Sequence, residues 1–413
     1  MVEYRRAHVF VVDSDSYPVH RDRMFCGVKN PDKYSRRKSK SDKWSQTLNT
    51  ARYGLYADMK AIRKGDLVFF YQMRIDEGKY DRGFRGIFEA TSDPFFDDSD
   101  IDGVAGSTGS LGSADKKVAG KCANCGSPLS EVWDTASESS VCRKCGTKQE
   151  WHILPNRILI RALKLFENTD GVEAVIDDNT AYIDRNYIKK NLPVLWTMLF
   201  RKTSGAGRAR SITHILPEEA FKLQFLFEDL FTEAKANNKT IVPYAKPAAA
   251  QPIETPLDCD GEGELDIEAL LEEWFMENLD KAIPVLKDII GNPADLEYFG
   301  NNVLYGVGGE KVDVLCIHRK GDDRYKATVI ELKKGDIGDD AVNQINDYTK
   351  WMSQLVFGDD VEASKRKIQP VLIGHSISEK VRKLAEETIK ETQKPIILLY
   401  NVKDTNMTFR RVL

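Results

Sequence analysis

The 413-residue chain contains no long apolar run, because nowhere do the roughly 20 consecutive apolar residues occur that a membrane-spanning helix needs. Its first residues, MVEYRRAHVFVVDSDS, lack the charged-then-apolar layout of a secretory signal peptide. It also lacks an internal repeat, which excludes a solenoid. We therefore expect an intracellular, cytoplasmic protein without a membrane partner. At about 100–200 residues per domain, it should form two or three domains.

Histidine is scarce, with six residues, and none stands at a spacing typical of metal ligands or a catalytic triad. The seven cysteines are odd in number, which argues against a disulfide framework and suits a reducing compartment. The net charge is only −4, but it is unevenly distributed. Residues 20–43 are strongly basic and residues 254–273 are acidic. The basic segment is either a nucleic-acid footprint or a solvated loop.

Two CxxC pairs stand after residue 120, and each is followed directly by glycine, at Gly126 and Gly146. Glycine lets a turn close around a metal, and four thiolates at this spacing are typical of a tetrahedral Zn²⁺ site. A redox pair is the alternative. Because four sulfur ligands leave no open position, we predict a structural zinc. Its ligands would be Cys122, Cys125, Cys142 and Cys145.

Composition divides the chain into an N-terminal and a C-terminal part. Short apolar runs at residues 7–12, 64–71 and 84–90 predict strands of a small β-rich barrel, and an apolar stripe at 217–233 predicts a helix. A Gly/Ser/Asp-rich segment and the cysteine pairs interrupt this part, and a proline-rich, acidic linker ends it. The predicted domains are 1–98 with 150–240, an insertion at 99–149, a linker at 241–264, and 265–413.

Beyond the linker the pattern becomes mixed α/β. It predicts helices at 266–280, 339–355 and 378–391, and strands at 311–318, 325–333, 370–374 and 395–400. Within the predicted hairpin, Glu331 and Lys333 project from one face, and Asp313 lies on the partner strand. Two carboxylates can bind Mg²⁺, and a neighbouring lysine can orient water or stabilise negative charge. The alternative is a surface hairpin carrying an ion pair.

The sequence around these residues, GEKVDVLCIHRKGDDRYKATVIELKKGDIGDDAVNQINDYTKWM at 309–352, resembles the PD-(D/E)XK nuclease superfamily and, within it, the NucS-type endonuclease domain. That resemblance covers roughly 265–401. It implies a restriction-endonuclease-like α/β core with a mixed sheet. Asp313 and Glu331 would be the Mg²⁺ or Mn²⁺ ligands and Lys333 the catalytic lysine.

Further roles follow from the same resemblance. Gln344 would face the site from its helix, with Tyr348 one turn later on the same face. The family also uses a glutamate on the preceding helix, for which Glu268 and Glu272 are candidates, with a slight preference for Glu268. Lys311 stands where the family has arginine, and lysine keeps the charge but loses the planar fork.

The N-terminal part, at roughly 5–98 and 150–235, resembles the EVE and PUA-like group of small β-barrels through KGDLVFFYQ, GIFEATSDPFFDD and LPVLWTMLFRKTSGAGRARSITHILPEEAFKL. The resemblance implies an α+β domain that binds nucleic acid and in some members reads a modified base. Glycines in the loop 201–211 let backbone N–H groups approach phosphate, and its cations can grip phosphate. These cations are Arg201, Lys202, Arg208 and Arg210.

Stacking on a flipped base could involve Trp44, Tyr56, Tyr71 or Trp196, each of which is individually more often a core residue. We therefore expect a metal-dependent DNA endonuclease whose N-terminal domain selects the target, in restriction or in repair. An RNA-directed nuclease and a nucleic-acid-binding protein with an inactive nuclease fold are the alternatives. A double-strand cut needs two active sites, which leaves a homodimer open.

Overall fold

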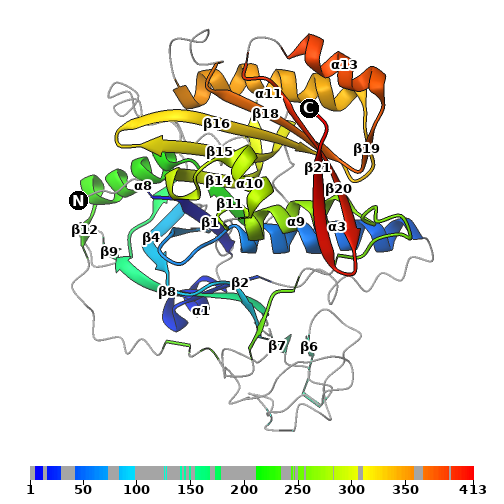
Figure 1. Ribbon diagram of the computed structural model, residues 1–413. Coiled ribbons are helices and arrows are strands. Elements are labelled where there is room, and N and C mark those ends of the chain that lie inside the picture. The colour runs from blue at the N-terminus through cyan, green and yellow to red at the C-terminus, as the bar shows by residue number, and fades with distance from the viewer. Residues whose placement is uncertain are drawn as a thin grey trace.

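The computed structural model divides the chain into a lower and an upper part in Figure 1. The described residues are 5–12, 16–28, 42–72, 83–97, 125, 127, 140–141, 144–145, 148–149, 154–167, 173–177, 211–233, 243–244, 246, 250–254, 257–281, 283–305, 310–357, 366–389 and 392–413. For residues 42–49, 140–141, 148–149, 177, 304–305, 310 and 354–355 only the backbone is described.

The N-terminal part is organised around one large sheet with the strand order β11-β1-β3-β4-β8-β5-β13, to which β10 and β2 attach at β4 and β8. Of the strand pairs that the structure describes in this sheet, only β1 and β3 are parallel. The strands are β1 (Ala7–Val12), β2 (Phe25–Val28), β3 (Leu67–Gln72), β4 (Gly83–Ala90), β5 (Phe95–Phe96), β8 (Asn156–Lys164), β10 (Ile176–Asp177), β11 (Ile212–Ile215) and β13 (Gln251–Pro252). The strands predicted at 7–12, 64–71 and 84–90 are confirmed as β1, β3 and β4. Among the described residues the strand path stays open, so barrel closure remains a prediction.

Among the described residues, three helices accompany this sheet: α1 (Ser16–Arg23), α3 (Asp42–Lys60) and α8 (Pro217–Leu230). Helix α8 confirms the helix predicted at 217–233, with an earlier end. It begins at Pro217, where proline loses no hydrogen bond because the first helical N–H groups have no partner within the helix. The Glu219 carboxylate accepts a hydrogen bond from the Leu216 N–H at 2.7 Å and so caps the first turn.

Small strands complete the N-terminal part. They are β6 (Ser140–Val141), β7 (Lys148–Gln149), β9 (Phe166–Glu167) and β12 (Thr232–Glu233). Strand β13 lies within the predicted linker 241–264 and pairs with β5, so this stretch adds to the N-terminal sheet.

The C-terminal part contains a six-stranded mixed sheet in the order β14-β15-β16-β18-β20-β21. Strands β16, β18 and β20 are parallel, and the other pairs are antiparallel. The elements are α9 (Glu268–Asn278), α10 (Pro284–Ile290), the 3-10 turn η2 (Pro293–Asp295), β14 (Leu296–Tyr305), β15 (Glu310–Lys320), β16 (Asp323–Leu332), β17 (Asp336–Ile337), α11 (Asp339–Phe357), β18 (Ile368–Gly374), β19 (Ser376–Ile377), α13 (Glu379–Thr388), β20 (Ile396–Lys403) and β21 (Asn406–Arg411).

Each helix and strand predicted after the linker is present, within a few residues of its predicted bounds. The prediction missed α10, β14, β21 and the two-residue strands β17 and β19. Strand β14 carries Gly300, Asn301 and Asn302 in its middle, a combination typical of a turn. The two edge strands, β14 and β21, therefore had weaker signals than the apolar central strands.

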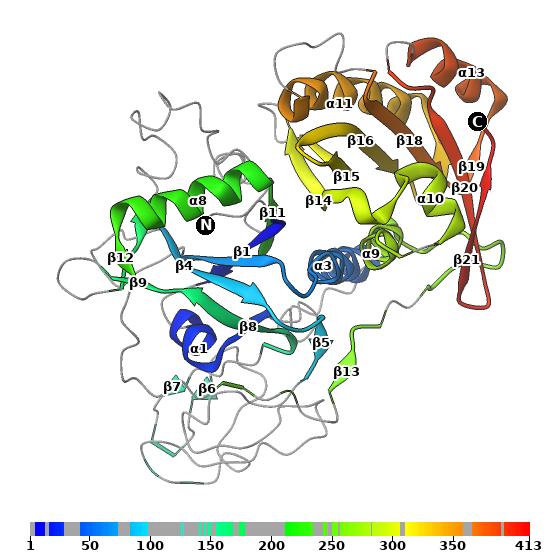
Figure 2. The same cartoon turned by 60° about the vertical axis from the view of Figure 1, so that its left-hand side comes forward.

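The two faces of the C-terminal sheet contact different helices. Alternating residues such as Leu315 and Val329 pack with α11 and α13, and the intervening residues such as Val314 and Ile330 pack with α9 and α10. The apolar cluster that contains Val314 and Ile330 also includes residues of helix α3, among them Tyr56. Figure 2 shows α3 and α9 side by side, seen nearly end-on, between the two parts. The linker predicted from sequence therefore joins two parts that share a core.

Candidate active site beside the β15–β16 hairpin

The hairpin of β15 and β16 brings Asp313 and Glu331 together. A tight turn at Gly321, whose φ is +61°, connects the strands, as expected for a two-residue hairpin loop. The pairing places Val314 opposite Ile330, so Asp313 and Glu331 are the next residues along the two strands, far from the turn. The side chains converge where the hairpin is anchored in the sheet.

Hydrogen bonds hold the three predicted catalytic residues in this arrangement. The Lys333 ammonium lies 2.5 Å from Glu331 Oε1, which confirms that these side chains project together. The Leu332 N–H donates to Asp313 Oδ2 at 2.8 Å. Glu331 is 2% exposed, whereas the side chain of Lys333 is 23% exposed and faces solvent in part. The site thus combines the buried Glu331 carboxylate and the half-buried Asp313 carboxylate with a more accessible cation.

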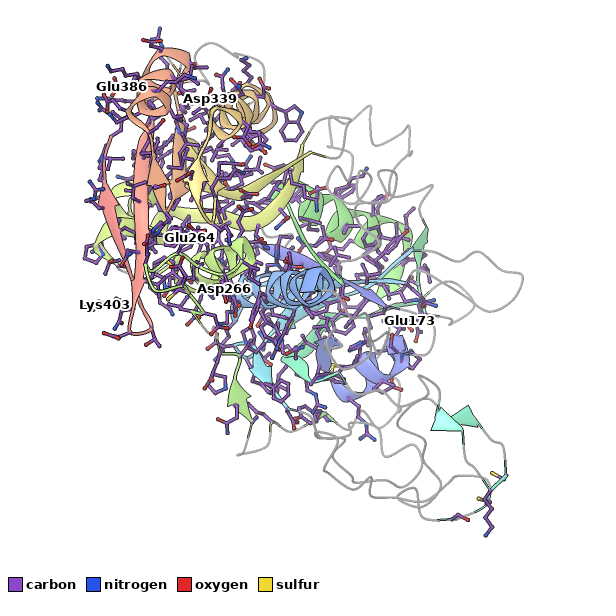
Figure 3. The ribbon with its side chains drawn as sticks, turned by 90° about the vertical axis from the view of Figure 1, so that its right-hand side faces the viewer. Glu173, Glu264, Asp266, Asp339, Glu386 and Lys403 are labelled. Carbon is purple, nitrogen blue, oxygen red and sulfur yellow. The ribbon has the colours of Figure 1, made fainter. Side chains whose placement is uncertain are left out.

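Two glutamates of α9 approach the same place. Glu268 accepts a hydrogen bond from the Lys334 N–H at 3.3 Å, and its charge acts on Asp313 more strongly than that of Glu272 does. Glu264 and Asp266, labelled in Figure 3, precede the first turn of α9. The geometry agrees with the preference for Glu268, whose metal role stays a prediction.

Burial and like charge make this site electrostatically unfavourable when it is fully ionised. Burial and then the neighbouring Glu331 carboxylate raise the pKa of Asp313 well above its ordinary value. Burial also raises the pKa of Glu331, although Lys333 opposes that rise. Burial alone would lower the pKa of Lys333, but the Glu331 carboxylate raises it. The lysine therefore stays charged, and the carboxylates repel each other.

These residues fit a divalent cation with oxygen ligands. Glu331 Oε2 is buried and has no hydrogen-bond partner, and Asp313 lies against the same carboxylate. In the part of the chain that the structure describes, no three His, Cys, Asp or Glu side chains converge into a complete metal site. Mg²⁺ typically uses one or two carboxylates and keeps several waters, so two oxygen donors suffice for it.

The repulsion predicts how stability depends on pH without metal. The pKa of the Asp313 carboxyl is higher in the folded chain than in the unfolded chain. This carboxyl therefore makes its full contribution to stability below the unfolded-state pKa. The contribution is lost as the pH rises through the folded-state pKa. We expect Asp313→Asn to have a higher urea midpoint than the native chain at pH 7.5 in a chelator, and an equal one at pH 4. A native chain as stable as the variant at pH 7.5 would contradict this.

The remaining residues that the nuclease resemblance predicted lie in the same part of the fold. Gln344 is exposed on α11, whereas Tyr348, one turn later, is buried in the core between α11 and the sheet. Lys311 lies on β15 two residues before Asp313, and is half-buried. The roles of these three residues stay predictions.

Most of the predicted nucleic-acid and zinc residues lie outside the described residues. These are Arg201, Lys202, Arg208, Arg210, Trp196, Cys122 and Cys142. Of Trp44 only the backbone, in α3, is described. Cys125 is half-buried and Cys145 is exposed. Tyr56 and Tyr71 are buried, which confirms the core interpretation for both.

Sequence reasoning missed Asn301 and Asn302 of β14. Both donate a hydrogen bond from Nδ2 to Glu272 Oε1. Asn302 has φ +52°, a left-handed conformation that asparagine tolerates better than most residues. Neither residue bears a charge or belongs to a recognisable motif, so only the β14–α9 contact reveals them.

Comparison with known proteins supports the N-terminal resemblance. Residues 23–113 match the family model of the EVE domain, which spans β2, α3, β3, β4 and β5. A solved structure titled "Structure of Hypothetical protein from Leishmania major" is similar at 13% identity, covering 55% of this chain and 98% of that chain, with a TM-score of 0.26. The comparison with curated proteins found no match. Among the described helices, none is long and apolar enough to cross a membrane.

Proposed function

We propose that the chain is a metal-dependent endonuclease that hydrolyses phosphodiester bonds of DNA. The convergence of Asp313, Glu331 and Lys333 carries the proposal. A buried and a half-buried carboxylate with one unsatisfied oxygen, beside a partly exposed lysine, suit a cation and a phosphate better than a purely structural ion pair. The mixed sheet flanked by α9 and α11 is compatible with a restriction-endonuclease-like core.

Asp313 and Glu331 would hold the cation, with Glu268 as a further acidic neighbour. When bound, Mg²⁺ would make a coordinated water more acidic and would neutralise charge on the phosphate. Lys333 keeps its proton beside Glu331, so its ammonium can donate to a phosphate oxygen or orient the attacking water. Burial of Glu331 and partial burial of Asp313 strengthen the interaction of these carboxylates with any cation that enters.

The N-terminal part would select the target. The EVE match supports this role, because the resemblance to the EVE and PUA-like group implies binding of nucleic acid. The loop at 201–211 and the base-stacking tryptophans, Trp44 and Trp196, are its candidate contacts from sequence. Such a division suits restriction of modified DNA or repair. A cleavage panel with DNA and RNA substrates distinguishes this function from RNA cleavage and from an inactive nuclease fold.

A cleavage panel tests the proposal. Purified full-length chain is incubated with plain, methylated, hydroxymethylated, mismatched and branched DNA, and with RNA, in Mg²⁺, in Mn²⁺ and in excess chelator. We expect cleavage of at least one DNA class with metal, and none in the chelator, because the carboxylates alone cannot activate water. Cleavage of RNA alone would replace the proposed substrate. Cleavage that survives the chelator would refute the metal role.

We also propose that the four cysteines bind one structural Zn²⁺, from their sequence spacing alone. A loop-rich segment of this size has little core of its own and needs a metal to fold. Elemental analysis of the purified chain should find one zinc per chain, and Cys142→Ser should lower that value while leaving Asp313-dependent cation binding intact. Well under one zinc per native chain would refute the site.

A further inference from the structure

A buried polar path leads from the N-terminal sheet to the candidate active site. His8 Nδ1 of β1 lies 2.7 Å from His214 Nδ1 of β11, and His8 Nε2 lies 2.9 Å from Asp66 Oδ2. His214 Nε2 lies 3.8 Å from Asp58 Oδ1 of α3. Asn301 of β14 donates to this same Asp58 oxygen at 2.9 Å. The path crosses from the part that contains the EVE match into the nuclease-like part.

Asn301 is the point where the crossing occurs. Its Nδ2 group donates one hydrogen bond to Asp58 and another to Glu272, so one amide bridges two carboxylates from different helices. Ionised carboxylates cannot donate, which fixes the amide orientation with the nitrogen toward both. This orientation leaves the amide oxygen unsatisfied: Asn301 is 3% exposed, and its Oδ1 is buried without a hydrogen-bond partner.

The backbone around Asn301 permits this close approach. Gly300 precedes it, and a Cβ atom there would lie 2.6 Å from the Tyr298 hydroxyl and 3.1 Å from His214 Cβ. Only glycine lets β14 come this near to β11. The contact between the two parts and the amide bridge therefore occur at one place.

Glu272 connects the bridge to the site. It shares one face of α9 with Glu268, one turn away, and Glu268 accepts a hydrogen bond from the Lys334 N–H beside the site. Asn301, which binds Glu272, pairs with Val314 of β15, the residue next to Asp313. Glu272 Oε1 accepts from both Asn301 and Asn302, which holds the carboxylate on the β14 side of the helix. Loss of the Asn301 amide removes one of these two hydrogen bonds, so the Glu272 carboxylate can shift and contribute less of the negative potential that attracts a cation.

We propose that Asn301 is a positioning residue that holds Glu272 beside the Asp313–Glu331 pair and makes this position depend on Asp58 in helix α3. The inference rests on the proposed function, because it assigns a role toward the cation. Through the Asn301 amide, helix α3 of the N-terminal part is connected directly to an acidic residue of the candidate active site. A shift of α3 against α9 on target binding would move Glu272 through a single amide.

The test measures Mn²⁺ binding to the full-length chain by electron paramagnetic resonance, which separates bound from free ion without requiring activity. Asn301→Leu keeps the side-chain shape and removes the donor. We expect its half-saturating Mn²⁺ concentration to rise about tenfold, the low end of losses caused by removing an outer partner of a metal site. The control is Gln369→Leu, a buried amide in β18 that donates to the backbone oxygens of Pro370 and Lys394.

A second measurement separates positioning from general destabilisation. Asp58→Ala should weaken Mn²⁺ binding several-fold in the native chain and cause no further loss when Asn301→Leu is present. Asn302→Gly removes the other donor while suiting the left-handed backbone, and should cause a smaller loss that adds to that of Asp58→Ala. All variants are first shown to be folded by their urea midpoints.

The outcomes are distinguishable. Mn²⁺ binding that Asp313→Asn leaves unchanged refutes the proposed function, and the positioning role with it. Binding that depends on Asp313 but is unchanged by Asn301→Leu overturns the inference alone. Equal losses in Asn301→Leu and Gln369→Leu, or an Asp58→Ala loss that persists in full beside Asn301→Leu, also overturn it.

Discussion

Asp313→Asn and Glu331→Gln are each expected to reduce metal-dependent cleavage by at least about 10³-fold, equivalent to about 4 kcal/mol of transition-state stabilisation. Both substitutions keep the shape of the side chain and remove the charge that a cation requires. The loss is large because each variant leaves a single charged carboxylate of the pair to hold the cation, and Mg²⁺ uses one or two carboxylates in its sites. The measurement is the initial rate on the best substrate of the cleavage panel.

The control for these variants is Asp322→Asn. Asp322 belongs to the same hairpin but lies exposed at the turn, at the opposite end from Asp313 and Glu331. Its substitution should leave the rate within about twofold of the native value, because an exposed carboxylate away from the site acts mainly through screened charge. Lys333→Met distinguishes a loss of catalysis from a loss of metal, since it should lower the cleavage rate while leaving Mn²⁺ bound. Native rates in either carboxylate variant would disprove the site assignment.

The hairpin and its charged residues could be predicted from sequence because local signals suffice there. Alternating apolar residues define two strands, Gly321 marks the turn, and the spacing of Glu331 and Lys333 puts them on one face. The ion pair between them is the local consequence of that spacing. Burial could not be predicted in the same way, since it depends on helices that cover the strands.

The environment of the site escaped prediction because it is built by residues far apart in sequence. Asn301 contacts Asp58, 243 residues earlier, and no pattern in either segment predicts this contact. Helices α3 and α9 pack against each other in space. In sequence they are separated by the whole intervening chain, including the acidic stretch that predicted a linker. A proline-rich composition reports local backbone preference, whereas the packing of flanking helices is decided by their apolar faces.

The shared core changes how the two parts should behave in solution. A flexible linker would let a target-selecting module and a cutting module move independently. Here Tyr53 and Tyr56 of α3 belong to one apolar cluster with Leu271 and Phe275 of α9. Such an interface holds the two parts in one orientation, so the proposed target, if bound by the N-terminal part, would be presented to the candidate site at a defined angle.

Lys60→Met is therefore expected to destabilise the protein by about 3–5 kcal/mol, the usual effect of removing one partner from a buried ion pair. The Lys60 ammonium of α3 lies 3.0 Å from Glu273 Oε1 of α9, and the side chains are 7% and 0% exposed. The substitution leaves the buried Glu273 carboxylate without the cation that faces it. Because the pair spans α3 and α9, the loss should be seen in both parts of the protein at once.

Lys281→Met is the matched control, since both lysines also contact Glu277, Lys60 at 2.8 Å and Lys281 at 3.2 Å. The Lys281–Glu277 pair is 51% and 40% exposed, and removing an exposed pair costs at most about 1 kcal/mol. Urea unfolding followed by tryptophan fluorescence and by far-ultraviolet circular dichroism should give coincident transitions for all three chains, with only Lys60→Met strongly shifted. Equal midpoints for the two variants would show that Glu273 does not need Lys60. Separate transitions by the two probes would instead show that the N-terminal and C-terminal parts unfold independently, against the shared core of α3 and α9.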